Sequence, residues 1–325
     1  MLAGDIIQGK LQTITNNGLT WIDIQKPTRN NLEMIGQQYS FHELNLEDCL
    51  SKIQIPKMDK YNDYIFVILH FPTIEKKEKT SSLKVSQLSI FVGINFVVTV
   101  HQGDLKPLVE MFYLCKQSDK QRQILMGTSS GYLLHSILDL LVDDLLHILM
   151  KVVGNLDDIE DAVFDDKITV VKEISLLRRD ITTLRRVVVP LKRTVSEMAK
   201  IIQRFSEEDL TQYFDDVKDH TDKVVEILEE SKETIEIYKD TDFMLNTEKT
   251  NKILAILTIL FTLSIPVTTI GTFYGMNVNL PGGIQTGSWN FFGIYTTMIV
   301  IIVLSVTSAL FMVWYFRRLG WIGVS

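Results

Sequence analysis

A long stretch without ionisable side chains fills the last quarter of the chain. Between Ile253 and Phe316 there is no Asp, Glu, Lys, Arg or His. One polar interruption, Tyr274 to Ser288, divides this stretch. A bilayer core is about 30 Å thick, and one helical crossing needs ~20 apolar residues. The stretch therefore predicts two transmembrane helices, at 253–276 and 289–316, joined by a loop at 277–288.

The charges that flank the two spans predict their orientation. Lys249 and Lys252 precede the first span, and Arg317 and Arg318 follow the second. Cationic residues favour the cytoplasmic side of a membrane. The first residues lack the basic start and apolar core of a signal peptide. We therefore expect a multi-pass protein of the cell membrane, with both termini, including the tail at 317–325, in the cytoplasm.

The first part of the chain has the composition of a mixed α/β domain, which we place at 1–125. Runs rich in β-branched and aromatic residues predict strands at 19–24, 64–71 and 88–100. Thr28 is a plausible cap for a helix over 28–38. Residues 76–82 are predicted to connect two strands as a hairpin.

From about residue 126 the apolar residues recur at helical spacing, which predicts a helical region at 126–211 and a stalk helix at 212–252. There is no Gly or Pro from Leu191 to Ile265. One helix over 212–276 has a length of roughly 100 Å. Such a helix needs lateral partners, and self-association is an economical source of them. The acidic segment 154–167 is interpreted as a solvated helix face and turn, or as an attractor for cations.

Two spans cannot enclose a wide aqueous path, so conduction requires several copies around one axis. The first span offers a stripe for such a path, with residues three or four apart: Leu254, Leu257, Phe261, Ile265, Thr268 and Thr272, continued by Asn277. The alternative is that these side chains pack against neighbouring helices. Neither span nor loop holds a carboxylate. Because Mg2+ gives up water reluctantly, amide groups of Asn suit a hydrated ion better than a bare one.

Enzymatic motifs are absent from the sequence. There is no GxxxxGK[ST] phosphate loop and no GxSxG, and His42-Glu43 lacks the second His of a zinc protease motif. The six His are scattered and are interpreted as structural or surface residues. Cys49 and Cys115 give no disulfide framework and are expected to be buried thiols. We predict that the protein is not an enzyme.

The tetrapeptide Tyr274-Gly275-Met276-Asn277, between a long helix and a final span, closely resembles the CorA family of magnesium channels. Other segments resemble the family along nearly the whole chain: WIDIQKPT near Trp21, FHELNLEDCL (41–50), PKMDKYNDYIFVIL (56–69), QYFDDVKDHTDKV (212–224) and the pore helix at 251–277.

The resemblance implies an α+β cytoplasmic domain built as an α/β/α sandwich, a long stalk helix and two transmembrane helices, assembled as a homopentameric funnel. It implies that Gly275, Met276 and Asn277 form the selectivity filter for hydrated Mg2+. Thr268 matches a polar pore ring, and Leu254, Leu257 and Ile265 match an apolar constriction that gates by dewetting.

Regulation is also implied by the resemblance. Asp216 is in register with a carboxylate that binds regulatory Mg2+ between neighbouring subunits, and Glu75 is its nearest candidate partner. Mg2+ is thus expected both as cargo and as regulator, with Co2+ or Ni2+ as further cargo. Bound cytoplasmic Mg2+ would hold the pore shut through differential binding to two states.

The sequence departs from the family pattern at both mouths of the pore. The loop Val278 to Gly283 lacks the acidic residue that often follows the tripeptide, and only Arg317 and Arg318 stand where a longer lysine cluster is common. Selectivity is therefore expected to rest on amide geometry.

Other functions fit the same architecture. One is a transporter for zinc or another divalent cation, although relatives of that kind usually alter the residue that is Met276 here. Another is a non-conducting, membrane-anchored adaptor. The expected partners are other copies of the chain, the lipid bilayer and divalent cations, with no nucleic acid.

Overall fold

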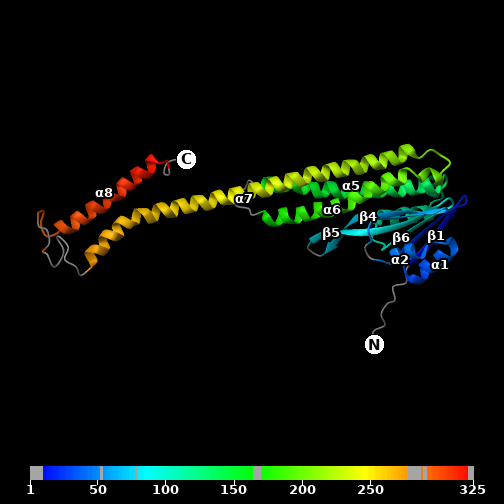
Figure 1. Ribbon diagram of the computed structural model, residues 1–325, viewed down its shortest axis with the longest axis horizontal. Coiled ribbons are helices and arrows are strands. Elements are labelled where there is room, and N and C mark those ends of the chain that lie inside the picture. The colour runs from blue at the N-terminus through cyan, green and yellow to red at the C-terminus, as the bar shows by residue number, and fades with distance from the viewer. Residues whose placement is uncertain are drawn as a thin grey trace, which may run out of the picture. The chain divides into compact units, whose positions relative to one another are not determined.

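The computed structural model describes residues 10–51, 54–77, 80–163, 170–276, 287 and 291–320. By its internal contacts the chain divides into two compact units, Met1–Asp240 and Thr241–Ser325. Figure 1 shows the elements of both units.

The first unit contains a six-stranded sheet of order β1-β2-β6-β5-β4-β3. Its strands are β1 (Lys10–Asn16), β2 (Leu19–Gln25), β3 (Lys57–Lys60), β4 (Tyr64–Lys77), β5 (Thr80–Gly93) and β6 (Phe96–His101). Strands β2 and β6 are parallel, and every other neighbouring pair is antiparallel. The described helices of this unit are α1 (Arg29–Tyr39), α2 (Glu43–Leu50), α3 (Lys106–Gln117), α4 (Asp119–Met126), α5 (Ser130–Val163), α6 (Val171–Ala199), the short 3-10 helix η1 (Ile202–Phe205) and the first part of α7 (Thr211–Gly275).

Helices cover both faces of the sheet, so the unit is a three-layer α/β/α sandwich (Figure 1). Successive side chains of a strand point to opposite faces. Phe66 and Ile68 of β4 thus join α1 and α2 in one core. Ile65 and Val67 join α3, α5, α6 and α7 in the other. The predicted α+β fold with an α/β/α sandwich is therefore confirmed.

Several local predictions can be compared with these elements. Thr28 caps α1 as expected, and its side chain accepts a hydrogen bond from the Asn31 amide at 3.3 Å. The single strand predicted over 88–100 is wrong, because the chain turns between Gly93 and Phe96 and forms two antiparallel strands. A Cβ at Gly93 would overlap the Phe96 ring, so any larger residue at this turn would have to displace that ring. The connection predicted over 76–82 is also too long, since β4 and β5 remain paired as far as Lys77 and Thr80.

A buried polar network joins the parallel strands β2 and β6. The Asp23 carboxylate is fully buried and accepts hydrogen bonds from Thr99 Oγ1 at 2.7 Å and Gln25 Nε2 at 2.9 Å. His101 Nε2 lies 3.0 Å from the same carboxylate, and His101 Nδ1 accepts a bond from the Gly103 amide. The Gly103 bond assigns the ring proton to Nε2. The network thus satisfies a charge that would be costly to bury alone.

Helices α5, α6 and α7 share a core with coiled-coil spacing. Buried residues on α6 recur three and four apart at positions a and d: Ile174, Leu177, Ile181, Leu184, Val188, Leu191, Val195 and Met198. On α7 the same pattern is formed by Phe214, Val217, Thr221, Val224, Leu228, Ser231 and Ile235. These residues belong to the larger core, in which the buried face of α5 also takes part.

A ladder of three ion pairs runs between the antiparallel helices α6 and α7. Arg178 contacts Glu236 at 3.1 Å, Arg185 contacts Glu229 at 2.6 Å, and Lys192 contacts Asp222 at 2.7 Å. Each step of seven residues forward on α6 is matched by seven residues back on α7. One exposed pair contributes only about 0–1 kcal/mol, but three in one register disfavour a slip of one helix along the other.

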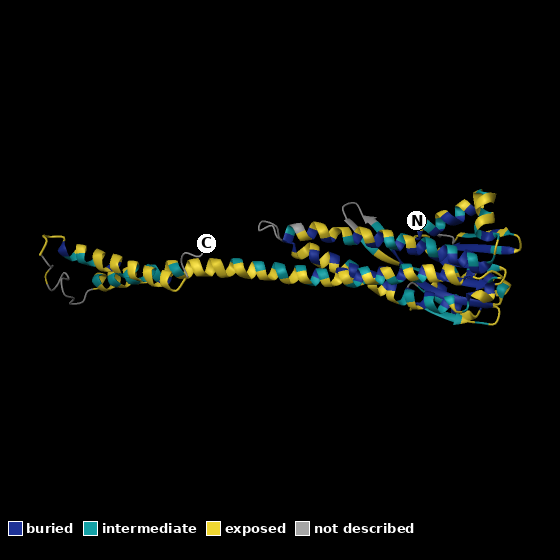
Figure 2. Ribbon diagram, turned by 90° about the horizontal axis from the view of Figure 1, so that it is seen from above, coloured by how far each residue is buried: buried dark blue, intermediate teal, exposed yellow. Residues whose placement is uncertain are grey.

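The second unit holds the rest of α7 and α8 (Thr296–Arg318). Both helices are long and apolar enough to cross a membrane, by length and composition. Their most apolar 18-residue windows are 0% and 11% buried within the chain, and most of their surface in this unit is exposed (Figure 2). A core helix of a soluble protein would be mostly buried, so burial within this chain does not account for their composition.

The shared helical core predicts that shortening a side chain on α6 lowers the free energy of unfolding more when that side chain is buried. Leu184→Ala should lower the free energy of unfolding by about 2–5 kcal/mol, because Leu184 is 0% exposed in the α6 seam. Leu176→Ala, on the same helix but 43% exposed, is the matched control and should change it by about 0.5 kcal/mol or less. Thermal unfolding of the full chain in detergent measures both variants, and equal shifts would contradict the assigned seam.

Candidate functional site

The predicted pore residues lie along one face of α7. The four apolar members have exposed fractions between 43% and 67% within the chain: Leu254, Leu257, Phe261 and Ile265. The two polar members, Thr268 and Thr272, are also exposed. Intervals of three and four keep these six residues on one side of a helix with 3.6 residues per turn. The structure thus brings the six predicted residues together as a stripe that the chain itself does not cover.

Hydroxyl groups on this stripe have a defined direction. Thr268 Oγ1 donates to the Ser264 carbonyl at 2.5 Å, and Thr272 Oγ1 donates to the Thr268 carbonyl at 2.7 Å. Each hydroxyl has one proton and two lone pairs. Because the proton bonds the backbone, each oxygen can offer only lone pairs to its surroundings. This polar part of the stripe can therefore accept hydrogen bonds.

The predicted filter is only partly described by the structure. Gly275 ends α7, and the Met276 amide donates to the Phe273 carbonyl at 3.3 Å. No side chain of the described residues lies within 4 Å of a Cβ built on Gly275. Asn277 lies outside the described residues, and its role stays a prediction.

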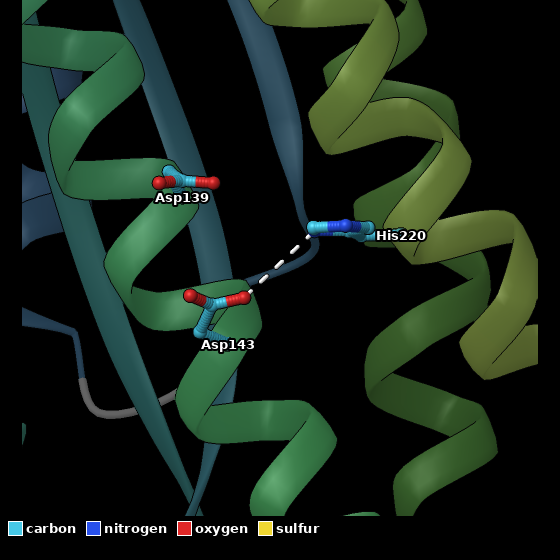
Figure 3. A group of neighbouring side chains, drawn as sticks. All are labelled: Asp139, Asp143 and His220. Atoms are coloured by element: carbon cyan, nitrogen blue, oxygen red, sulfur yellow. Dashed lines mark ion pairs between the residues drawn. The ribbon is translucent and has the colours of Figure 1, made fainter.

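A second group of polar side chains lies between α5 and α7 in the first unit (Figure 3). Asp139 and Asp143 lie one turn apart on α5, and His220 faces them from α7. Ligand atoms of these three residues all lie within 4.8 Å of one another. His220 is 3.8 Å from the Asp143 carboxylate and 4.0 Å from that of Asp216, one turn away on α7. We call these four residues the acidic cluster.

Burial and mutual repulsion shape the electrostatics of the acidic cluster. Burial raises the pKa of Asp139; His135 and His220 act to lower it, and the charges of Asp143 and Asp216 act to raise it. The neighbouring His135 is buried, and burial lowers its pKa. Its Nδ1 has no hydrogen-bond partner within the described part of the chain. The cluster thus holds three carboxylates close together, and burial disfavours the charged form of Asp139, which a bound cation would stabilise.

The donor set of the acidic cluster fits a divalent cation. Carboxylate oxygens are the usual protein ligands of Mg2+, which keeps several of its waters. Imidazole favours transition metals such as zinc, and is also common for nickel. A spacing of up to 4.8 Å between ligand atoms leaves room for water between the ion and some of these groups.

The two predicted regulatory residues have different surroundings. Asp216 belongs to the acidic cluster, next to His220. Glu75 lies near the end of β4 and forms an ion pair with Lys84 at 2.6 Å. Asp139, Asp143 and His220 were not identified from the sequence as metal ligands, and the histidines were interpreted as structural or surface residues. A usable signal was the i, i+4 spacing within each pair, Asp139 with Asp143 and Asp216 with His220.

An α/β/α unit and two uncovered apolar helices, the first of which is the end of the long helix α7, form the arrangement expected of an integral membrane protein. A family model described as "CorA-like Mg2+ transporter protein" matches residues 16–318. The chain therefore belongs to the CorA family of divalent metal-ion transporters, as its resemblance to that family predicted. Because the family consists of transporters, this result is consistent with the expectation that the protein is not an enzyme.

Relatives match the chain along most of its length. A cobalt/magnesium transport protein CorA of Thermotoga maritima is 29% identical over 93% of this chain and 83% of its own length. A putative metal ion transporter, YfjQ of Bacillus subtilis, is 26% identical over 94% and 90%. Among solved structures, the complete CorA magnesium transporter of Methanocaldococcus jannaschii has a TM-score of 0.75 and 21% identity, covering 96% of this chain and 94% of that one. This last similarity supports the fold.

The acidic cluster predicts that Asp139→Asn stabilises the protein in the absence of divalent cations and reduces the stabilisation that Mg2+ provides. Since burial raises the pKa of Asp139, its charged form is disfavoured by folding. That penalty is fully present above the folded-state pKa and disappears as pH falls below the ordinary value of 3.8. At neutral pH without divalent cations, Asp139→Asn should therefore raise the melting temperature. With Mg2+, the wild type should gain about 2.7 kcal/mol at 100 times Kd, and the variant less.

Asp215→Asn is the matched control, because Asp215 is an exposed carboxylate on α7 outside the cluster. Differential scanning calorimetry of the full chain, at neutral pH with and without Mg2+, measures all three proteins. An equal Mg2+ shift in the wild type and in Asp139→Asn would exclude Asp139 as a ligand.

Proposed function

We propose that this protein is a channel that takes up Mg2+, driven by the membrane potential, as a homopentamer in the cell membrane. Both termini and the first unit lie in the cytoplasm, α7 lines the pore, and 277–288 is the outer loop. Co2+ and Ni2+ are further cargo. The observation that carries this proposal is the uncovered stripe of α7, where apolar side chains are followed by hydroxyl oxygens that can only accept.

The stripe suits a hydrated cation for a simple reason. A hydrated Mg2+ ion presents water protons outward, so its shell needs acceptors. Thr268 and Thr272 offer such acceptors, since their own protons bond the backbone. Asn277 extends the same chemistry with an amide oxygen, and Gly275 and Met276 present it at the outer mouth. Copies of these residues around one axis would form rings that hold the ion with its water.

The apolar part of the stripe is proposed as the gate. Leu254, Leu257, Phe261 and Ile265 carry no polar side-chain atom. A narrow ring of such side chains excludes water and thereby ions. Conduction then requires a wider arrangement of the α7 helices, and any ligand that stabilises the narrow arrangement closes the channel.

Cytoplasmic Mg2+ is proposed as that ligand. Asp216 and the rest of the acidic cluster hold negative charge that a cation would neutralise, and Glu75 is retained as a candidate partner from a neighbouring copy. Binding between subunits favours the state that brings these groups together. His220 is the specific observation that favours a second candidate, regulation or transport of zinc or another transition metal, because imidazole binds such ions well.

Flux into liposomes across a defined potential tests the function. Each charge moved inward gains ~2.3 kcal/mol per 100 mV, so a divalent ion gains about twice that. We expect Mg2+ entry to rise with an inside-negative potential, and to fall when Mg2+ is added on the Asp216 side. Asn277→Ala should abolish entry, because the first acceptor ring is lost, without preventing assembly.

Asn279→Ala, two residues further along the loop, is the control and should conduct. Undiminished flux through Asn277→Ala would remove Asn277 from the mechanism. Zinc entry without Mg2+ entry would favour the zinc transporter, and no flux of any divalent ion would favour the adaptor.

Thr268 provides a sharper test of the hydroxyl chemistry. Thr268→Val keeps the shape of the side chain and removes the acceptor from every copy in the ring. This should lower Mg2+ flux at least about tenfold, which is the effect of a single lost hydrogen bond. Thr268→Ser retains the oxygen and should conduct nearly as the wild type does. Thr262→Val removes a hydroxyl with the same kind of backbone bond, about 100° around α7 from the centre of the stripe. If Thr262→Val and Thr268→Val impaired flux equally, the loss would come from the helix and not from the pore surface.

A further inference from the structure

The outer face of α6 carries a positive charge at every seventh residue. Its core residues occupy heptad positions a and d, which puts position f on the side opposite the core. The four f positions of the helix are Lys172, Arg179, Arg186 and Arg193, and all four are exposed. We call them the basic α6 stripe.

The outer face of α7 carries the complementary charge at the same spacing. Counted from its own core positions, its f positions in the first unit after Gln212 are Asp219, Glu226, Glu233 and Asp240, and all four are exposed. We call them the acidic α7 stripe. Both stripes repeat every seven residues, or about 10.5 Å along a helix.

Neither stripe is neutralised by the other within one chain. The ion pairs that join α6 to α7 use different residues, Arg178, Arg185 and Lys192 on the α6 side. Over the described residues, no ion pair connects the two stripes. The contacts that Arg179, Arg193 and Asp240 do make are with carboxylates or a lysine of their own helix, at 3.6–3.8 Å. Two opposite, periodic charge patterns are thus left on different sides of one bundle.

The stripes also lie at matching levels. Lys192 is opposite Asp222, so in the antiparallel register residue 195 is level with Asp219. Arg193 is therefore two residues, or ~3 Å, from the level of Asp219. The shared repeat of seven gives the same small offset to Arg186 with Glu226, to Arg179 with Glu233 and to Lys172 with Asp240. A rotation about an axis parallel to the helices moves a copy sideways and leaves these levels unchanged.

We propose that the basic α6 stripe of one copy docks against the acidic α7 stripe of the next copy. The partner is a second copy of this chain, and the inference rests on the homo-oligomer of the proposed function. Different surfaces meet in such an interface, which is heterologous and closes into a ring when the rotation permits. Rows of exposed charges contribute more to partner choice and register than to raw affinity, so the stripes would set how neighbours align around the ring.

Charge reversal and its rescue test the pairing. The full chain in detergent is measured by light scattering over a dilution series, in low and high salt. The triple variant Arg179→Glu, Arg186→Glu, Arg193→Glu should dissociate at a concentration at least about tenfold higher than the wild type does. Combining it with Asp219→Lys, Glu226→Lys, Glu233→Lys should restore assembly, because attraction returns with the signs exchanged.

A matched control separates this pairing from a general effect of charge. A second triple variant makes the same charge change at exposed positions elsewhere in the first unit: Arg29→Glu, Lys116→Glu and Lys120→Glu. This control should assemble as the wild type does. If the triple α6 variant assembles as the wild type does in low salt, the proposed pairing of the stripes is wrong, although the proposed homo-oligomer stands. A wild type that is monomeric would instead refute the proposed homo-oligomer.

Cross-linking keeps the test decisive if the triple variant fails to fold. Cys49 and Cys115 are buried, which raises their pKa to about 12 and about 11, so both native thiols react poorly at neutral pH. A chain with Arg186→Cys and Glu226→Cys, treated with a short bismaleimide, should give covalent multimers on a denaturing gel. Each single substitution alone should give none. Absence of multimers from the double variant, with an oligomeric wild type, would contradict the docking.

Discussion

The shared apolar seam of α5, α6 and α7 is the constraint on which the rest of the first unit depends. It places α7 against α5, and only this arrangement brings His220 to Asp139 and Asp143. The three ion pairs between α6 and α7 then disfavour axial slips smaller than one heptad. Because α7 is one helix from Thr211 to Gly275, Asp216 and Thr268 belong to the same element. A change in the seam is thereby a change in the helix that carries the proposed pore residues.

The two proposed ion sites, the stripe on α7 and the acidic cluster, differ in the groups that they offer to a cation. The stripe on α7 has no charge at all, and its polar atoms are hydroxyls whose protons bond the helix backbone. Such a surface can pass an ion with its water and hold it only briefly. The acidic cluster gathers three carboxylates around His220, which favours residence over passage. A protein that must both move and sense one kind of ion needs both kinds of site, kept apart along the chain.

The sequence predicted what depends on local patterns. Helical spacing was enough to place the six stripe residues on one face, and Thr28 was recognisable as a helix cap. Strand β1 was missed, although Asn17 and Gly18, both with positive φ, are a turn signal between β1 and β2. The break between β5 and β6 was hidden because both strands are buried and show no alternation. The acidic cluster joins residues far apart in sequence, so it required the packing of α5 on α7, which no local pattern specifies.

The buried network around Asp23 has a consequence for how the chain is made. Strand β2 pairs with β6, and Asp23 finds its hydrogen-bond partner Thr99 only 76 residues later. Ribosomes add ~5–20 residues per second, so for several seconds Asp23 has Gln25 as a partner but lacks Thr99 and His101. The sheet is therefore completed only after its last strand is synthesised. Any factor that shelters the nascent amino-terminal hairpin would act in that interval.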